Sequence, residues 1–187
     1  TLYQMTEIMS RGGGVGINLS SLRPRFAYVK GVHGKSSGAV SWGGIFSYAT
    51  ALIEQGGSRR GALMLMMYDW HPDVLEFISA KQTKGVIENA NVSVLISDKF
   101  MAAVANDDVW NLEFPDYENS ENKAAYDAHW NGTIEEWKAK GLGTKIYKTV
   151  RARDMWDKII RCAHGSAEPG IVFYERYNKL SNSYYFN

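Results

Sequence analysis

The sequence predicts a mixed α/β fold in which short apolar strands alternate with amphipathic helices. In residues 41–55, apolar side chains repeat at the i, i+3, i+4 and i+7 spacing of one buried helix face. Residues 63–68 are apolar throughout, as expected of a strand buried on both faces of a sheet. The alternation runs to about residue 174 without an internal repeat or a linker. We therefore predict parallel strands joined by crossover helices, in either a barrel or an open doubly wound sheet.

The first third of the chain is expected to begin with a helix at residues 2–10, followed by glycines and a short strand at 15–19. Residues 23–38 are irregular, and the helix at 41–55 follows them. After the strand at 63–68, Asp69 is expected to cap a helix over 74–78. The later elements are predicted to be strands at 92–96, 110–114, 145–150 and 171–174 and helices from 98, at 133–140 and at 153–164. The other residues of 116–143 are read as a surface excursion without strands.

Composition and charge exclude several classes of protein. The chain has 187 residues and a net charge of +1, so its overall charge does not favour nucleic acid or an anionic membrane. No apolar run reaches the roughly 20 residues of a spanning helix. The single cysteine, Cys162, excludes an internal disulfide and favours a reducing, cytoplasmic location. The chain starts at Thr1 without methionine and ends in aromatic residues, so we expect a piece of a longer protein.

A loop rich in glycine and arginine, residues 54–61, is the first candidate binding element. Its glycines permit left-handed or closely approached backbone, and Arg59 and Arg60 each offer a planar fork of donors. Such a loop can order around a base or a phosphate. A solvated turn explains the same residues.

Two glycine motifs fail as nucleotide signatures. Residues 12–16 lie between a helix and a strand, the reverse of the dinucleotide-binding order. Residues 34–36 resemble the end of a P-loop, but Val29 stands where the first glycine is required. The basic loop around them, with Arg23 and Lys30, fits either phosphate binding or a mobile cationic loop.

No catalytic or metal-binding set is evident from residue spacing. The four histidines lie at no metal-ligand spacing. The cluster at 69–73 suggests acid–base chemistry, but a capping aspartate beside a hydrogen-bonded histidine is the preferred interpretation. Cys162 lies on an apolar helix face and is interpreted as a small buried hydrophobe. Residues alone thus favour a nucleotide-binding α/β segment without an assigned reaction.

A series of motifs in fixed order resembles the large subunit of ribonucleotide reductase. The motifs are RGGGVGIN at 11–18, LRP at 22–24, EQGGSRRGA at 54–62, WHPD at 70–73, SDKFM at 97–101 and YNKLSN at 177–182. They span essentially the whole chain. The residues of these motifs are most similar to those of the adenosylcobalamin-dependent class II enzymes. A class I catalytic subunit with a separate radical-generating partner is the alternative.

The resemblance implies a fold and an activity. The family fold is a ten-stranded α/β barrel of two half-barrels, of which residues 1–187 would form about the first half as a single partial domain. The activity is conversion of ribonucleotides to deoxyribonucleotides by thiyl-radical chemistry. Residues 23–38 and 54–61 match the two specificity loops, which bind a deoxynucleoside triphosphate effector and transmit its identity to the substrate site.

The resemblance also implies residue roles. The implied substrate-binding residues are Gly13, Gly14, Arg59 and Arg60. The implied effector-binding residues are Arg23, Val29, Lys30, Ser36, Glu54, Gln55, Gly57 and Ser58. The implied partners of the parent protein are adenosylcobalamin bound outside this chain, a thioredoxin-type reductant and a second copy in a homodimer.

The departures from the family pattern are informative. The chain has no Asn-x-Cys-x-Glu motif for the radical cysteine, and Cys162 does not stand in one. Catalysis is therefore expected to need residues outside this chain, which alone is expected to be inactive. Phe26 replaces an expected small residue in the first loop. A non-catalytic nucleotide-binding α/β domain that reuses the pattern is the second hypothesis.

Overall fold

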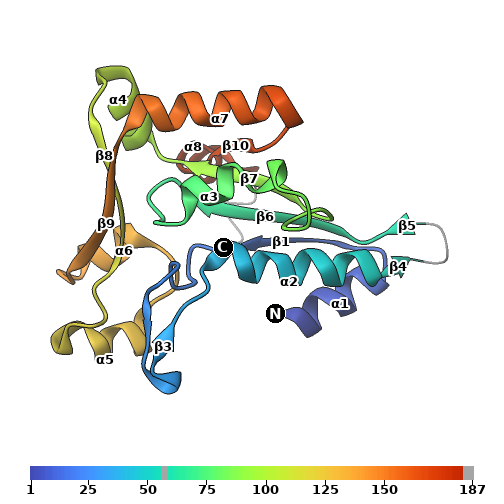
Figure 1. Ribbon diagram of the computed structural model, residues 1–187, viewed down its shortest axis with the longest axis horizontal. Coiled ribbons are helices and arrows are strands. Elements are labelled where there is room, and N and C mark those ends of the chain that lie inside the picture. The colour runs from blue at the N-terminus through green and yellow to red at the C-terminus, as the bar shows by residue number, and fades with distance from the viewer. Residues whose placement is uncertain (56–58, 183–187) are drawn as a thin grey trace.

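The computed structural model describes residues 1–55 and 59–182. Its centre is a sheet of four parallel strands in the order β1-β6-β7-β10, which confirms the predicted parallel pairing (Figure 1). The strands are β1 (Gly14–Asn18), β6 (Ala62–Tyr68), β7 (Asn91–Ile96) and β10 (Gly170–Phe173). Leu65 fixes the central register, because it pairs with Ile17 on one side and Val92 on the other.

The helices nearest this sheet cover one of its faces, and the others lie beside it. The described helices are α1 (Leu2–Ser10), α2 (Ala39–Leu52), α3 (Val74–Ile78), α4 (Asp98–Asn106), α5 (Ser120–His129), α6 (Ile134–Ala139), α7 (Ala152–Ser166) and α8 (Tyr174–Leu180), with 3₁₀ turns η1 (Lys30–Val32) and η2 (Ala80–Gln82). Alternate residues of β6 and β7, such as Leu65 and Val94, form the main core with Phe77 of α3 and Ile159 of α7. Gly43 lets α2 approach closely, because a Cβ there would lie 3.2 Å from a Leu65 methyl group.

The prediction that residues 63–68 are buried on both faces is wrong for the described residues. Leu63, Leu65 and Met67 are buried, whereas the Met64 side chain on the opposite face is 39% exposed. An all-apolar strand with one uncovered face agrees with a sheet that forms part of a barrel.

A second unit packs beside the sheet. Strands β8 (Val109–Pro115) and β9 (Thr144–Arg151) form an antiparallel hairpin that carries α5 and α6 between them (Figure 1). The sequence predicted both strands and α6, but the expected parallel pairing is wrong for β8 and β9, which a long excursion joins as antiparallel neighbours. It also missed α5 and α8. The sequence of α5 is mostly polar and lacks a helical apolar repeat. It is held by a separate aromatic core that includes Phe114, Tyr117 and Trp137.

The two predicted binding loops each contain a short hairpin. In residues 23–38, β2 (Tyr28–Val29) pairs with β3 (Gly34–Lys35), so this segment is more regular than predicted. At 54–61, β4 (Glu54–Gln55) pairs with β5 (Arg59–Arg60). The two hairpins lie at opposite ends of α2 (Figure 1), which is 14 residues and therefore about 21 Å long.

The polar residues that follow β6 connect separate elements, and the predicted capping role of Asp69 is wrong. The Asp69 carboxylate accepts hydrogen bonds from the Ser97 backbone N–H at 2.6 Å and from its hydroxyl at 2.8 Å, and so holds the start of α4. Asp73 instead accepts from the N–H of Ala39 at 2.8 Å, which caps α2 across the fold. The sequence spacing did not indicate either of these partners.

Gly38 is expected to be essential to this junction. It has a φ of +94°, and a Cβ there would lie 2.9 Å from both the Arg25 Cβ and the Asp73 carboxylate. Gly38→Ala should therefore lower the free energy of unfolding by about 2–3 kcal/mol, measured by denaturant titration. The matched control is Gly85→Ala, with a φ of +86° but no heavy atom within 4 Å, where the loss should be about 1 kcal/mol. Equal losses would show that the crowding at Gly38 is unimportant.

Candidate functional site

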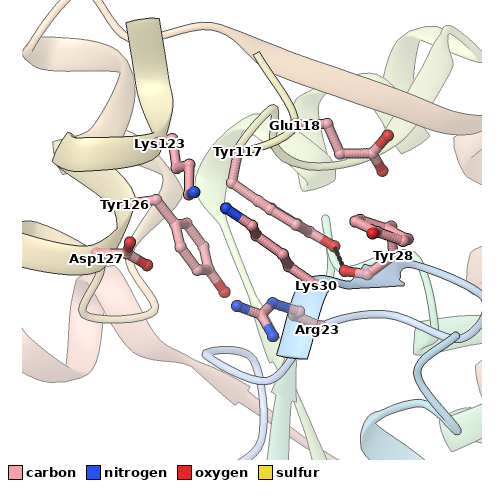
Figure 2. A pocket seen from close by; sticks show the side chains of 8 residues that line it. All are labelled: Arg23, Tyr28, Lys30, Tyr117, Glu118, Lys123, Tyr126 and Asp127. Carbon is pink, nitrogen blue, oxygen red and sulfur yellow. Dashed lines mark hydrogen bonds between the residues drawn. The ribbon is translucent and has the colours of Figure 1, made fainter. Parts of the chain in front are cut away.

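The candidate site is a cavity of about 340 Å³ between the first loop and α5. Arg23, Tyr28 and Lys30 come from the loop, and the opposite wall comes from the β8–α5 segment (Figure 2). That wall consists of Tyr117, Glu118, Lys123, Tyr126 and Asp127. The cavity therefore joins two segments far apart in the sequence.

Arg23 is positioned by two phenol rings. Its guanidinium carbon lies 5.0 Å from the ring centroid of Tyr117 and 5.5 Å from that of Tyr126, within the range of a cation–π contact. Its buried Nε atom has no acceptor in the described part of the chain. A buried donor without a partner is costly, so an added acceptor at this position would be stabilising.

Three cations and two carboxylates, those of Glu118 and Asp127, set the electrostatics of the cavity. The nearby Lys30 ammonium lowers the pKa of the Lys123 ammonium. Burial raises the pKa of Tyr117 to about 12, against the opposing effect of the Arg23 charge. Because Arg23 adds a third positive charge, the cations outnumber the two carboxylates, and the arrangement favours an anionic ligand that lies between the cations.

The first loop is held in shape by its own backbone. The Phe26 N–H donates to the Ser36 carbonyl at 2.9 Å, and the Ser36 hydroxyl donates to the Arg23 carbonyl at 3.1 Å. The Tyr117 hydroxyl donates to the Tyr28 carbonyl at 2.9 Å, which ties the loop to the opposite wall. Phe26, flagged as a departure, adopts a φ of +66° and is largely exposed.

A second cavity of about 480 Å³ adjoins the first and shares Arg23 and Tyr126 with it. It is lined also by Val29, Ser36 and Trp42. The four predicted effector residues of the first loop thus each line one of two adjoining cavities. The structure brings Arg23, Val29, Lys30 and Ser36 together, and their binding roles stay predictions.

The predicted substrate-binding residues lie away from these cavities, at one end of the sheet. Gly14 pairs with Ala62 at the amino end of the sheet, next to the hairpin that contains Arg59 and Arg60. The backbone therefore brings the four predicted substrate residues to one end. Gly13 has a packing role as well, because a Cβ there would lie 2.7 Å from the Ile8 side chain.

The predicted effector residues Glu54 and Gln55 lie in the same hairpin, so the fold separates them from Arg23. Gly57 and Ser58 lie outside the described residues.

The structural interpretations of His71 and Cys162 are confirmed. His71 is fully buried, with Nε2 3.0 Å from the Leu22 carbonyl and Nδ1 accepting from the Asp73 N–H at 3.1 Å. Burial lowers the pKa of His71, so the imidazole ring is neutral. Both of its nitrogens have backbone hydrogen-bond partners. Cys162 is 3% exposed within α7. The described residues contain no group of three or more side chains suited to a metal ion. None of their helices is long and apolar enough to cross a bilayer.

The sequence did not single out the α5 wall. Tyr117, Lys123 and Tyr126 belong to the segment read as a surface excursion, and no local motif marks them. The available signal is three aromatic residues and a single lysine, Lys123, within the otherwise acidic segment 116–130. Only the fold shows that they face Arg23.

The parallel sheet with one uncovered face agrees with part of an α/β barrel. The family model described as "Ribonucleotide reductase, barrel domain" matches residues 1–186. The chain belongs to the ribonucleotide reductase family, as its motifs predicted, and this match favours the enzyme hypothesis over an unrelated nucleotide-binding domain.

Relatives named as vitamin B12-dependent, and others without that name, align with nearly the whole chain. It is 36% identical over 180 residues to a vitamin B12-dependent ribonucleoside-diphosphate reductase of Thermoplasma acidophilum, with 96% of this chain and 20% of the relative covered. A vitamin B12-dependent ribonucleoside-diphosphate reductase of Mycobacterium tuberculosis is 29% identical, with 97% and 22% covered. A ribonucleoside-diphosphate reductase large subunit of Variola virus is 28% identical, with 97% and 24% covered. The chain thus spans about a fifth to a quarter of these relatives.

Proposed function

We propose that this chain is the effector-binding part of a reductase that converts ribonucleotides to deoxyribonucleotides. The observation that carries the proposal is the convergence of Arg23, Lys30 and Lys123 on one cavity. The ligand is a deoxynucleoside triphosphate, whose phosphates neutralise these three cations. Arg23 can bind two phosphate oxygens through its planar fork.

The adjoining cavity accommodates the rest of the effector. It shares Arg23 with the phosphate region and offers apolar surface from Val29 and the ring of Trp42. A base seated there contacts the wall formed by the first loop and the start of α2. Differences between bases are then transmitted through α2 to the hairpin at 54–61 as differences in binding energy.

The separation of the two loops supports a homodimer as the working form. Because α2 is about 21 Å long, an effector at Arg23 lies far from residues 54–61 of the same chain. The outer face of α2 carries exposed apolar side chains, including Trp42, Ile45 and Leu52, with Tyr48 68% exposed. Packing this face against a second copy in the opposite direction places one chain's first loop beside the other's second loop.

Adenosylcobalamin is proposed as the radical-generating cofactor of the parent protein, supported by the two relatives named as vitamin B12-dependent. The residues at Arg23 do not fit it, because their cavity is small and cationic, whereas the corrin ring with its adenosyl group is bulky. The cofactor is therefore proposed to bind away from this cavity and, as the family resemblance implies, outside this chain. When bound, it supplies the radical that a cysteine outside this chain needs.

The assignment is tested by nucleotide reduction with the parent protein, a thioredoxin-type reductant and a deoxynucleotide effector. Reduction that requires both the effector and adenosylcobalamin supports the class II proposal. Reduction that requires an added radical-generating subunit instead assigns the protein to class I. Absence of reduction under both conditions, with effector binding retained, would reject the enzyme proposal and leave a nucleotide-binding protein.

Lys123 gives a prediction specific to the α5 wall. Lys123→Ala is expected to weaken effector binding by about three- to tenfold, because one of three converging charges is lost. The loss should shrink as salt is raised, which titration calorimetry at two ionic strengths measures. Lys140→Ala, an exposed lysine at the end of α6, is the matched control and should bind normally. Equal behaviour of the two variants would remove α5 from the site.

A further inference from the structure

A continuous row of oxidisable rings runs from the sheet to the Arg23 cavity. In order, the rings are Tyr174, Tyr68, Trp70, Trp130, Tyr126 and Tyr117. Successive ring centroids are 4.8, 5.4, 6.2, 6.1 and 4.8 Å apart. Each pair is therefore in direct contact. All six are tyrosine or tryptophan, the side chains that most readily lose one electron to a radical.

The tryptophans in the middle of the row are suited to transferring an electron rather than to remaining oxidised. The contact between Trp70 and Trp130 joins the two halves of the row. Trp70 is 2% exposed, and its indole N–H has no acceptor among the described residues. An indole that has lost an electron is trapped when its N–H proton leaves. Without an acceptor, Trp70 keeps its proton and returns to the neutral state by taking an electron from a neighbouring ring.

The two ends of the row differ in charge. At one end, the Arg23 guanidinium lies over Tyr117 and Tyr126, which makes removal of an electron from these rings harder. At the other end, the Tyr174 hydroxyl donates to the Glu175 carboxylate at 3.3 Å. Negative charge from Glu135 also acts on Tyr174 and Tyr68. The charges therefore favour an electron vacancy at Tyr174 over one at Tyr117.

We propose that these six rings form a one-electron relay in which Tyr174 is the resting site of the vacancy. In the last step, Tyr68 relays an electron from Tyr174 to the oxidised Trp70 ring. The Trp70 radical cation becomes neutral tryptophan, the Tyr174 phenol becomes a neutral tyrosyl radical, and its proton passes to the Glu175 carboxylate. One electron and one proton are transferred, and the charge is balanced.

The relay needs a one-electron oxidant, which in the parent protein is an organic radical of the class used in ribonucleotide reduction. To this extent, its biological use rests on the proposed function. Tyr68 is the last residue of β6 and Tyr174 directly follows β10, so this end of the row lies at the carboxyl edge of the sheet. If a neighbouring ring lost an electron, the relay would transfer the oxidation to Tyr174, where the resulting tyrosyl radical is held beside Glu175.

The experiment uses photo-oxidation, which requires no nucleotide chemistry. A ruthenium polypyridyl photo-oxidant is attached to the parent protein through Glu118→Cys, next to Tyr117, after exposed cysteines outside this chain are replaced by serine; the native Cys162 is buried. Flash oxidation should produce a long-lived tyrosyl radical, detected by transient absorption and electron paramagnetic resonance. Tyr174→Phe should abolish that radical. Because this variant removes only one hydroxyl group, it should leave the packing of the rings intact.

Two further comparisons separate a relay from a merely structural aromatic core. Glu175→Gln should shorten the radical's lifetime without slowing its formation, because only the proton acceptor is changed. Trp130→Phe should prevent the radical from reaching Tyr174, whereas Trp137→Phe, a neighbouring ring outside the row, should not. An unchanged radical in Tyr174→Phe would overturn the relay, as would equal effects of the two tryptophan variants. Neither result depends on whether the parent protein reduces ribonucleotides.

Discussion

Arg23→Ala is expected to weaken binding of the deoxynucleoside triphosphate effector by about 10- to 100-fold, corresponding to about 1.5–3 kcal/mol for a charge-assisted contact. The physical reason is that Arg23 borders both cavities and is held between two phenol rings. Its removal eliminates a phosphate contact and the cation that the rings position. Titration calorimetry with the parent protein measures the change, and effector-dependent activity should fall in parallel.

Two companion variants sharpen the Arg23 prediction. Arg25→Ala is the matched control, because the Arg25 guanidinium pairs with Glu76 at 3.1 Å and does not line either cavity. Its effector affinity should stay within about twofold of the wild type, as expected for an exposed ion pair. Arg23→Lys keeps the charge but loses the planar fork, so it should recover only part of the affinity. A normal affinity for Arg23→Ala would place the effector elsewhere.

Protein stability is expected to fall as pH rises from about 4 to 7, because of Asp69. Burial is the main cause that raises the pKa of its carboxyl group to about 7 in the folded protein, against hydrogen bonds from Ser97 that lower it. The folded state therefore binds a proton that the unfolded state, with a pKa near 4, releases. Asp69 contributes most stability below pH 4 and loses this contribution by pH 7. The linkage is worth up to about 4 kcal/mol.

The measurement is the free energy of unfolding from urea titrations at several pH values. Asp69→Asn keeps the shape and an oxygen for Ser97 but cannot ionise, so the decline between pH 4 and 7 should be reduced by the amount that Asp69 contributes. Asp154→Asn, at an exposed position in the first turn of α7, is the control and should leave the pH slope unchanged. If Asp69→Asn also leaves the slope unchanged, the buried carboxyl is not the titrating group.

The proposed regulation depends on how α2 connects its two ends. Asp73 caps the start of α2 and also accepts hydrogen bonds from the Arg25 N–H, so the first loop and the helix share one anchor. At the other end, the Gly61 N–H donates to the Ile53 carbonyl at 3.0 Å, just before β6 begins. A ligand that shifts the first loop can therefore act on the hairpin through a rigid helix.

The sequence alone determined the central sheet, its parallel strands and α1, α2, α4, α6 and α7 to within a few residues. It did so because local periodicity and flanking glycine or proline decide whether a segment forms a helix or a strand. The motif order also identified the family. The burial of Cys162 followed from its apolar helix face, and the hydrogen-bonded, non-catalytic role of His71 from its place in the polar cluster after a buried strand.

Tertiary structure alone decided what faces Arg23. Tyr117 donates to the Tyr28 carbonyl across 89 residues, and no local pattern records such a partner. The same applies to Asp69, whose expected local capping role is replaced by a bond to Ser97. The mostly polar α5 is stabilised by aromatic packing of its surroundings rather than by its own apolar repeat. Periodicity specifies elements, whereas the cavity arises from contacts between elements that only the packed chain brings together.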